Sequence, residues 1–316
     1  MISFLDFEKP VAELESRIAD LRTTAASGAV DIDSEVAKLE KKSSALLTST
    51  YAKLTPWQKT QVARHPQRPH FLDYVGLMFE NFMPLGGDRR FGEDEAILGG
   101  PARLNGRKVM LIGHEKGHDT ASRLKHNFGM GKPEGYRKAA RLMEMAGKFG
   151  LPVVTLVDTA GAFPGVEAEE RGQSEAIARA TEACLALPVP MVAVIVGEGG
   201  SGGAVALASA ERVLMLEHAI YSVISPEGSS SILWRTPDKA ADAAEAMKVT
   251  AQDLLGLHVI DRIVPEPIGG AHRDAQATAS ALGQAIDEEL NGLAGLSADE
   301  LIGRREERYL RIGRLA

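Results

Sequence analysis

The residues best suited to chemistry in this sequence form a glycine-rich stretch, Gly-Glu-Gly-Gly-Ser-Gly-Gly, at positions 197–203. The apolar, β-branched run at 190–196 predicts a buried strand, and the run of small residues at 204–210 predicts a helix. A strand that turns into a helix leaves backbone N–H groups free at the positive end of the helix dipole. Because glycine lets a ligand approach these groups closely, the stretch is suited to hold a phosphate or an oxyanion.

A dinucleotide-binding fingerprint is one interpretation of this stretch. Gly197, Gly199 and Gly202 have the required spacing, and Glu217, 20 residues after Gly197, stands where an acid would bind a ribose. The following helix would be short for such a fold, because only about eight residues precede the next expected strand at 212–216.

A hydrolase nucleophile elbow is a second interpretation. Ser201 lies between Gly199 and Gly203, and Asp261 and His272 follow in the order of a catalytic triad, although neither lies in a triad signature of its own. A third interpretation uses backbone N–H groups alone as an oxyanion hole and needs no protein nucleophile.

The composition narrows the class of protein. The chain has 316 residues, 44% of them hydrophobic and 25% charged, which is ordinary for a globular protein of one large or two small domains. A net charge of −7 argues against a nucleic-acid binder, and no apolar run approaches the ~20 residues of a membrane span. The single Cys184, expected in the core, excludes an internal disulfide and a cysteine-based zinc cluster. The acidic N-terminus lacks a signal peptide, so we expect a cytoplasmic protein.

The first 70 residues are expected to form a helical segment and a linker, separate from a domain at 71–316. Apolar residues at helical spacing, beginning at Val11 and resuming at Val36 after a break at Ser27–Gly28, predict a hairpin of two helices that serves packing or subunit contacts. The polar, proline-punctuated segment 65–70 is expected to be a rigid surface connection, with a contribution of basic groups to a site as the alternative.

The larger domain shows alternating strand and helix patterns. Strands are expected at 96–104 and 108–113, joined by a hairpin turn at Asn105–Gly106. Further patterns predict a helix at 134–149, a strand at 153–158, a loop at 159–165, a helix at 173–187 and the strands already named. Repeated β-α-β units imply a parallel sheet covered by helices, so the loop 159–165 and the glycine stretch should meet at the carboxyl edge of the sheet.

One part of this acidic chain is basic. Residues 103–148 hold eleven Lys or Arg against four Asp or Glu, and three histidines (His114, His118 and His126) without the close spacing typical of metal ligands. The excess is either a solvated helix face or a surface that attracts an anionic substrate or an acidic partner.

Four motifs together closely resemble the carboxyltransferase α subunit of bacterial acetyl-CoA carboxylase. They are GEGGSGGA at 197–204, DTAGAFPG at 158–165, EERGQSEAIA at 169–178 and YSVISPEG at 221–228. Similarity also extends through FLDFE at 4–8, ARHPQRP at 63–69, NFGM at 127–130, PEGYRKA at 133–139 and PEPIGGAHR at 265–273. The chain departs from the family pattern at Ala160, where proline is usual, and at Ser229, where cysteine or alanine is usual. Neither change removes a backbone donor.

The resemblance implies a crotonase-like α/β fold, a spiral of repeated ββα units, preceded here by the helical hairpin. It implies transfer of a carboxyl group from carboxybiotin to acetyl-CoA, giving malonyl-CoA for fatty acid biosynthesis. The implied partners are a biotin carboxyl carrier protein, biotin carboxylase and a zinc-ribbon β subunit, in an α2β2 assembly. Biotin is then carried on the separate carrier protein, and this chain needs no metal.

The resemblance also assigns site residues. The N–H groups of Gly202 and Gly203 are expected to form the oxyanion hole for the ureido oxygen of biotin. Gly199 and Gly200, with Gly161 and Ala162 on the neighbouring loop, are expected to line the same pocket. A catalytically silent scaffold with a basic docking face is the alternative from a different class, and the intact glycine stretch argues against it.

Overall fold

The computed structural model describes residues 3–26 and 33–313, and the expected helix break at Ser27–Gly28 lies outside them. Seven strands form one sheet: β1 Ile97–Leu104, β2 Arg107–His114, β3 Val153–Thr159, β4 Met191–Gly200, β5 Arg212–Leu216, β6 Ile220–Ser222 and β7 Arg262–Val264. The strands expected from the sequence are therefore confirmed, and β6 and β7 are added to them.

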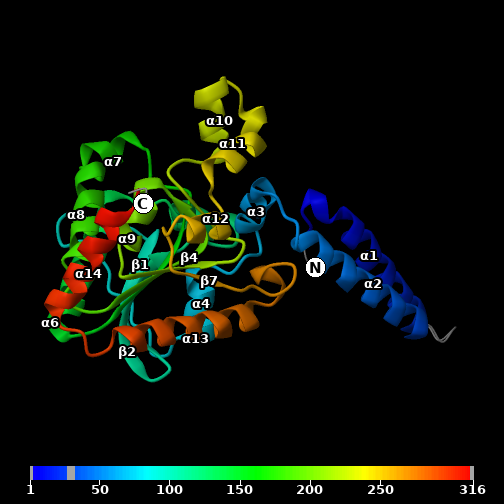
Figure 1. Cartoon of the computed structure of the whole chain (residues 1–316), viewed down its shortest axis with the longest axis horizontal. Coiled ribbons are helices and arrows are strands. Elements are labelled where there is room, and N and C mark those ends of the chain that lie inside the picture. The colour runs from blue at the N-terminus through cyan, green and yellow to red at the C-terminus, as the bar shows by residue number, and fades with distance from the viewer. Residues whose placement is uncertain (1–2, 27–32, 314–316) are drawn as a thin grey trace.

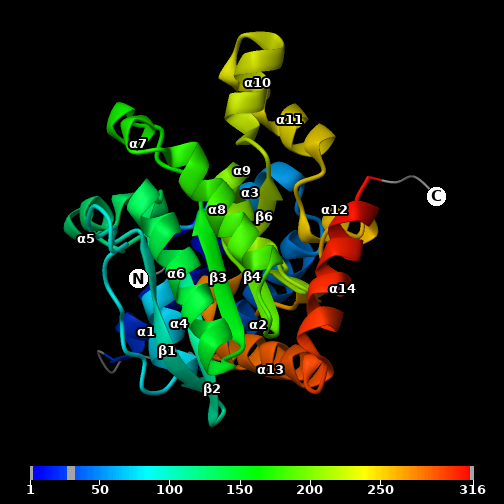
Figure 2. The ribbon, with the colours of Figure 1, turned by 90° about the vertical axis from the view of Figure 1, so that its left-hand side faces the viewer.

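The helices surround this sheet (Figures 1 and 2). The first seven are α1 Lys9–Ala26, α2 Asp33–Tyr51, α3 Pro56–Ala63, α4 Phe71–Met78, α5 Thr120–Lys125, α6 Pro133–Phe149 and α7 Val166–Glu170. The others are α8 Gln173–Leu185, α9 Ser201–Ala208, α10 Pro226–Trp234, α11 Ala240–Met247, α12 Ala251–Gly256, α13 Ala275–Leu293 and α14 Ala298–Arg311.

The sheet has the strand order β1-β2-β3-β4-β5-β7, and β6 pairs with the end of β4. β1 and β2 are antiparallel, whereas the other pairs are parallel. Asn105 and Gly106 both have positive φ, 48° and 78°, which is the geometry of the hairpin turn expected there. Because β2, β3 and β4 run in the same direction, the segments that follow them gather at one edge of the sheet.

Helices cover both faces of the sheet. Gly99 of β1 faces Leu142 of α6, and Gly113 of β2 faces Phe71 of α4, so α6 and α4 lie on opposite faces. α8 packs beside α6 (Figure 2), and Cys184 of α8 is buried in the core as expected. α13 lies with α4 on the other face. The buried strands read as continuous apolar runs because both faces are covered in this way.

The predicted N-terminal hairpin is formed by α1 and α2, which project from the body of the molecule (Figure 1). The two helices share a small core of their own around Ile18, Val36 and Leu39. Arg273 anchors the hairpin to the body through Glu15 at 2.9 Å. α10 and α11 form a second projection at the top of Figures 1 and 2. None of the described helices has the length and apolarity to cross a membrane.

Candidate active site

The two predicted site segments meet at the carboxyl edge of the sheet, where β3 and β4 end side by side. Thr159, the last residue of β3, pairs with Gly199 near the end of β4. β3 leads into the loop 160–165, here called the β3 loop, which contains Gly161 and Ala162. β4 leads directly into α9. The two segments therefore meet at the carboxyl edge of the sheet, as expected, and their role as a site stays a prediction.

The sequence predicted a strand that ends at residue 196 and a helix that begins at residue 204. The glycine stretch between them is not a separate loop, because the strand continues to Gly200 and joins the helix directly. Residues 198–200 continue β4 because they pair with β6, and α9 begins at Ser201, three residues earlier than expected. Ser201 is the turning residue, with φ at +51°, whereas all five glycines of the stretch have ordinary negative or extended φ values. The glycines are thus needed for close approach rather than for backbone freedom.

Two of these glycines allow the β3 loop to lie directly against the start of α9. A Cβ on Gly200 would lie 2.2 Å from the Ala160 carbonyl oxygen, and a Cβ on Gly203 would lie 2.8 Å from the Ala162 nitrogen. A Cβ on Gly203 would also lie 3.0 Å from the Tyr136 hydroxyl, which is buried and has no hydrogen-bond partner among the described residues. No side chain could be added at either glycine without moving the backbone of the β3 loop.

The other predicted residues of the stretch face different surroundings. A Cβ on Gly199 would meet the ring of Tyr221 at 2.8 Å, so this position faces the interior rather than a pocket. A Cβ on Gly202 would meet only Ile177, at an ordinary 3.4 Å. Gly202 is therefore the most open of the four glycines at 199, 200, 202 and 203.

Free backbone donors from both segments converge here. The first N–H groups of α9 have no partner within the helix, and no side chain caps them. In the β3 loop, Gly161 N–H donates to Thr159 Oγ1 at 3.1 Å, and Phe163 N–H donates to the Gly131 carbonyl at 3.0 Å. The Ala162 N–H between them makes no hydrogen bond within the described part of the chain. Such a set of N–H groups can stabilise an oxyanion.

A buried charge network supports the site edge, and the sequence analysis did not find it. Lys116, directly after β2, contacts Asp158 at 2.8 Å and Glu198 at 3.0 Å. Arg64 binds the other oxygen of Glu198 at 2.6 Å, and His70 lies 3.0 Å from Asp158. Burial alone would raise the pKa of Asp158, but the contacts with Lys116 and His70 hold it well below its usual range. Glu198, the acid inside the glycine stretch, was the one feature of the local sequence that pointed to this network.

The segment 65–70 is not the surface connection that the sequence favoured. His65, Arg68 and His70 are buried, and Arg68 is completely so. Arg68 forms a bidentate ion pair with Glu266, at 2.9 and 2.7 Å. The prolines shape a segment that is held inside by ion pairs with distant residues. Together with Arg64, this segment lines a cavity of about 260 Å³ beside Ala160, so the alternative expectation, basic groups near the site, describes it better.

The structure does not assemble the other two candidate sites. Asp261 binds Arg308 at 2.5 Å and His272 stacks on His65 at 3.7 Å between ring centroids, so neither is hydrogen-bonded to Ser201. Glu217 accepts the Glu266 N–H at 3.2 Å, and α9 has only 8 residues before the next strand. These contacts exclude the triad and disfavour the dinucleotide fingerprint.

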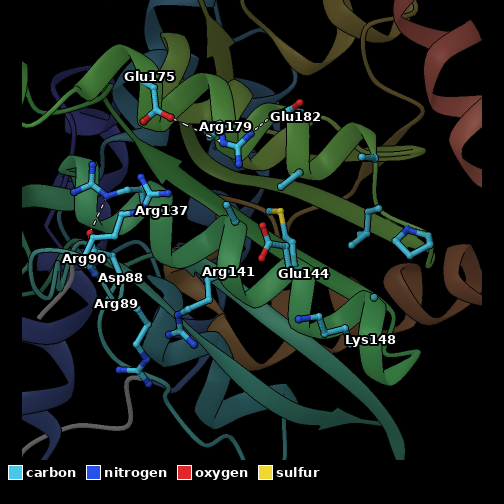
Figure 3. A pocket seen from close by; sticks show the side chains of 17 residues that line it. Asp88, Arg89, Arg90, Arg137, Arg141, Glu144, Lys148, Glu175, Arg179 and Glu182 are labelled. Carbon is cyan, nitrogen blue, oxygen red and sulfur yellow. Dashed lines mark hydrogen bonds and ion pairs between the residues drawn. The ribbon is translucent and has the colours of Figure 1, made fainter.

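A groove of about 810 Å³ lies between α6 and α8 (Figure 3). None of the predicted site residues lines it. Arg137 and Arg179 on its walls are paired with Asp88 and Glu182, at 2.8 and 2.9 Å. Arg141 instead donates to backbone carbonyls. Part of the predicted basic stretch thus lines this groove, and its attraction for an anionic partner stays a prediction.

The mixed sheet, its helical layers and the paired donor segments define an α/β protein of the crotonase-like class, as expected from the sequence. Solved structures support this fold. A Pseudomonas malonate decarboxylase hetero-tetramer in complex with coenzyme A has a TM-score of 0.57 and 18% identity, covering 71% of this chain and 91% of that one. A transcarboxylase 12S structure has a TM-score of 0.55 and 20% identity, covering 70% of this chain and 42% of that one.

Sequence relatives are much closer. Residues 4–313 match the family described as acetyl co-enzyme A carboxylase carboxyltransferase-like. An acetyl-coenzyme A carboxylase carboxyl transferase subunit alpha from Erythrobacter litoralis is 75% identical over 99% of this chain and 100% of its own length. The subunit of the same name from Rhizorhabdus wittichii is 68% identical with the same coverage. The chain belongs to this carboxyltransferase family, as its sequence motifs indicated.

Proposed function

We propose that the start of α9 and the β3 loop form the biotin-side oxyanion hole of an acetyl-CoA carboxylase carboxyltransferase. Family membership and relatives at 63–75% identity over nearly the whole chain make it the α subunit of this enzyme. The enzyme transfers a carboxyl group to acetyl-CoA and so forms malonyl-CoA for fatty acid biosynthesis. One observation carries the site assignment. The Ala162 nitrogen, whose N–H makes no hydrogen bond within the described part of the chain, lies against Gly203 at the start of α9, which no side chain caps.

The proposed roles follow from which donors are free. Gly202 and Gly203 supply N–H groups at the positive end of the α9 dipole. The geometry of the β3 loop favours Ala162 as the opposing donor, because the Gly161 N–H already donates to Thr159 Oγ1. Each such donor contributes on the order of 3 kcal/mol of transition-state stabilisation. Gly161 then lines the site, and Gly200 keeps the two segments in contact.

The residues fit a biotin group brought by a separate carrier protein. Gly202 is open, and Gly161 and Ala162 are half-buried, so the donors are accessible from outside. When bound, carboxybiotin would supply the carboxyl group, and transfer of this group would develop negative charge on the ureido oxygen. The chain's part is to stabilise that charge with donors already fixed in place, without a protein nucleophile.

We further propose that the site is completed by other proteins. Formation of an acetyl-CoA enolate creates a second oxyanion, and we assign its hole to a β subunit with a zinc ribbon. This chain has one cysteine and cannot supply such a ribbon by itself. We expect two α and two β subunits, working with biotin carboxylase and the biotin carboxyl carrier protein in the cytoplasm.

A reconstituted assay tests this function. The chain is purified with its β subunit and supplied with carboxylated carrier protein and acetyl-CoA, and malonyl-CoA is measured. We expect malonyl-CoA to form in proportion to the assembled complex. A folded and assembled complex that forms none would refute the proposed activity.

A further inference from the structure

The carboxyl end of β4 contains an irregularity just before the proposed oxyanion hole. β3 and β4 pair regularly as far as Val157 and Ile195, and the next pair is Thr159 with Gly199. Asp158 alone therefore lies opposite residues 196–198 of β4. Bulges of this kind redirect a strand and are often found beside active sites. Here the bulge lies directly before the passage from β4 into α9.

Side chains satisfy the backbone groups that the bulge leaves without strand partners. The Glu198 N–H donates to Asp158 Oδ1 at 2.9 Å, and the Val196 carbonyl accepts from Arg68 Nε at 2.8 Å. A Cβ on Gly197 would lie 2.4 Å from Asp158 Oδ1. Glycine at 197 therefore allows the Asp158 carboxylate to lie across the bulge.

Lys116 connects the two strands on either side of this bulge. Its Nζ lies 2.8 Å from Asp158 Oδ1 and 3.0 Å from Glu198 Oε2, and its side chain is only 15% exposed. The charged form of Lys116 is favoured, because these two carboxylates raise its pKa despite the opposing effect of burial. One ammonium group from the end of β2 thus joins the ends of β3 and β4.

The two joined residues lie next to the proposed donors. Asp158 is four residues before Ala162, and Glu198 is five residues before Gly203. The backbone segments beyond them touch at Gly200 and at Gly203 with no space for a side chain. A change in the separation of β3 and β4 at the bulge would therefore change the distance between the opposing N–H groups.

We propose that Lys116 is a positioning residue, which acts through Asp158 and Glu198 to hold the two halves of the oxyanion hole at the separation needed for carboxyl transfer. This inference rests on the proposed function of that hole. In this role Lys116 acts through the two carboxylates and not on the reacting atoms. Its contribution is the fixed geometry on which preorganised stabilisation of an oxyanion depends.

Two substitutions test this role in the assembled enzyme. Lys116→Met removes the ammonium group at similar volume, and Glu198→Gln weakens one of its two contacts while keeping the shape. We expect Lys116→Met to lower kcat by about 100-fold, the loss typical of a displacement of about 1 Å, with little change in the KM for acetyl-CoA. Glu198→Gln should show a smaller loss of the same kind.

Glu211→Gln is the matched control. Glu211 is a buried carboxylate near the other end of β4, where it accepts from Arg305 at 2.9 Å and from the Met191 N–H at 3.0 Å. The Glu211→Gln substitution should lower the melting temperature about as much as Glu198→Gln but leave kcat unchanged. If both glutamine variants lowered kcat equally, the network would be structural only and the positioning role would be wrong.

A measurement independent of activity separates this inference from the proposed function. Glycine-selective ¹⁵N labelling of the full chain reports on the amides of Gly161 and of the four glycines between 199 and 203. Lys116→Met and Glu198→Gln should shift these signals, whereas Glu211→Gln should not. Unshifted glycine amides in a folded Lys116→Met or Glu198→Gln protein would overturn the inference, whether or not the wild-type complex forms malonyl-CoA.

Discussion

At the scale of single residues, Ser201 has the most unusual position in the site. It is exposed, begins α9 and has a φ of +51°, a conformation that costs a non-glycine residue about 1–2 kcal/mol. Such strain at a strand-to-helix turn resembles that of a hydrolase nucleophile. Here it places the following N–H groups instead, because no described acid or base is hydrogen-bonded to the hydroxyl.

Ser201→Ala should therefore keep most of the carboxyltransferase activity, since it removes the hydroxyl and preserves the backbone. Initial rates of malonyl-CoA formation by the assembled enzyme measure this. Treatment with a fluorophosphonate probe is the complementary experiment, and we expect no labelling. Stoichiometric labelling of Ser201 would restore the hydrolase interpretation.

Gly203→Ala should strongly reduce carboxyl transfer. The new Cβ would lie 2.8 Å from the Ala162 nitrogen, so the β3 loop must move and the opposing donors separate. We expect a loss of 10²–10³-fold in kcat, as for removal of one oxyanion donor. Circular dichroism should show that the overall helix and strand content is retained.

Gly76→Ala is the matched control for this substitution. Gly76 lies in α4 and an added Cβ there would contact nothing within 4 Å, so activity should not change. Wild-type activity of a folded Gly203→Ala enzyme would show that this contact does not set the geometry of the hole.

At the scale of elements, α8 holds the β3 loop in place. Gln173, the first residue of α8, donates through Nε2 to the Gly131 and Phe163 carbonyls, both at 2.9 Å. Phe163 N–H also donates to the Gly131 carbonyl. The loop that carries Ala162 is thus fixed from outside the sheet as well as by β3.

Gln173→Leu should lower both stability and activity. It removes the hydrogen bonds to the buried Gly131 carbonyl and the part-buried Phe163 carbonyl, at a cost of about 1–3 kcal/mol in the free energy of unfolding. Chemical denaturation and kcat measure the two effects. Gln284→Leu on the exposed face of α13 is the control and should change neither. A Gln173→Leu enzyme with normal kcat would mean that the loop is positioned by β3 alone.

Local patterns predicted the elements well, and pairings between distant residues explain what they missed. Asn105–Gly106 and the apolar strands carry their own signals, so the hairpin and the parallel core were predictable. Asp158 and Glu198 lie 40 residues apart, and Lys116 and Glu198 lie 82 apart, so neither contact leaves a local pattern. The segment 65–70 was misread for the same reason, because Arg68 finds its partner Glu266 at a distance of 198 residues.

The glycine stretch shows the same limit at the site itself. Its residues were assigned from their type and from the family resemblance, and the structure brings Gly200 and Gly203 against the β3 loop. The direct passage from β4 to α9 could not be predicted, because it depends on pairing with β6, which follows about twenty residues later. The catalytic roles of these residues stay predictions.

At the scale of the whole molecule, the chain has two projections, α1–α2 and α10–α11 (Figure 1). α10 ends in exposed apolar side chains, with Ile232 72% and Leu233 64% exposed. Neighbouring exposed apolar side chains at the end of a projecting helix are consistent with a protein contact. It agrees with an α subunit that needs a partner.

The isolated chain should therefore be inactive. It offers one oxyanion hole for a reaction that develops two, so the missing stabilisation amounts to several kcal/mol of barrier. The monodisperse chain is assayed with acetyl-CoA and carboxybiotin, before and after addition of the β subunit. Full malonyl-CoA formation without a second protein would contradict the proposal that this chain supplies only one of the two oxyanion holes.

The burial of Cys184 has a practical consequence for observing that assembly. Cys184 belongs to α8, and its thiol is buried in the core. Burial raises the pKa of this thiol to about 12, so it is not ionised at neutral pH. Thiol reagents attack the thiolate, and this residue should not react in the folded protein. A cysteine introduced at Leu233 would be the one reactive thiol in the chain. A fluorophore attached there would report partner docking in the otherwise natural sequence.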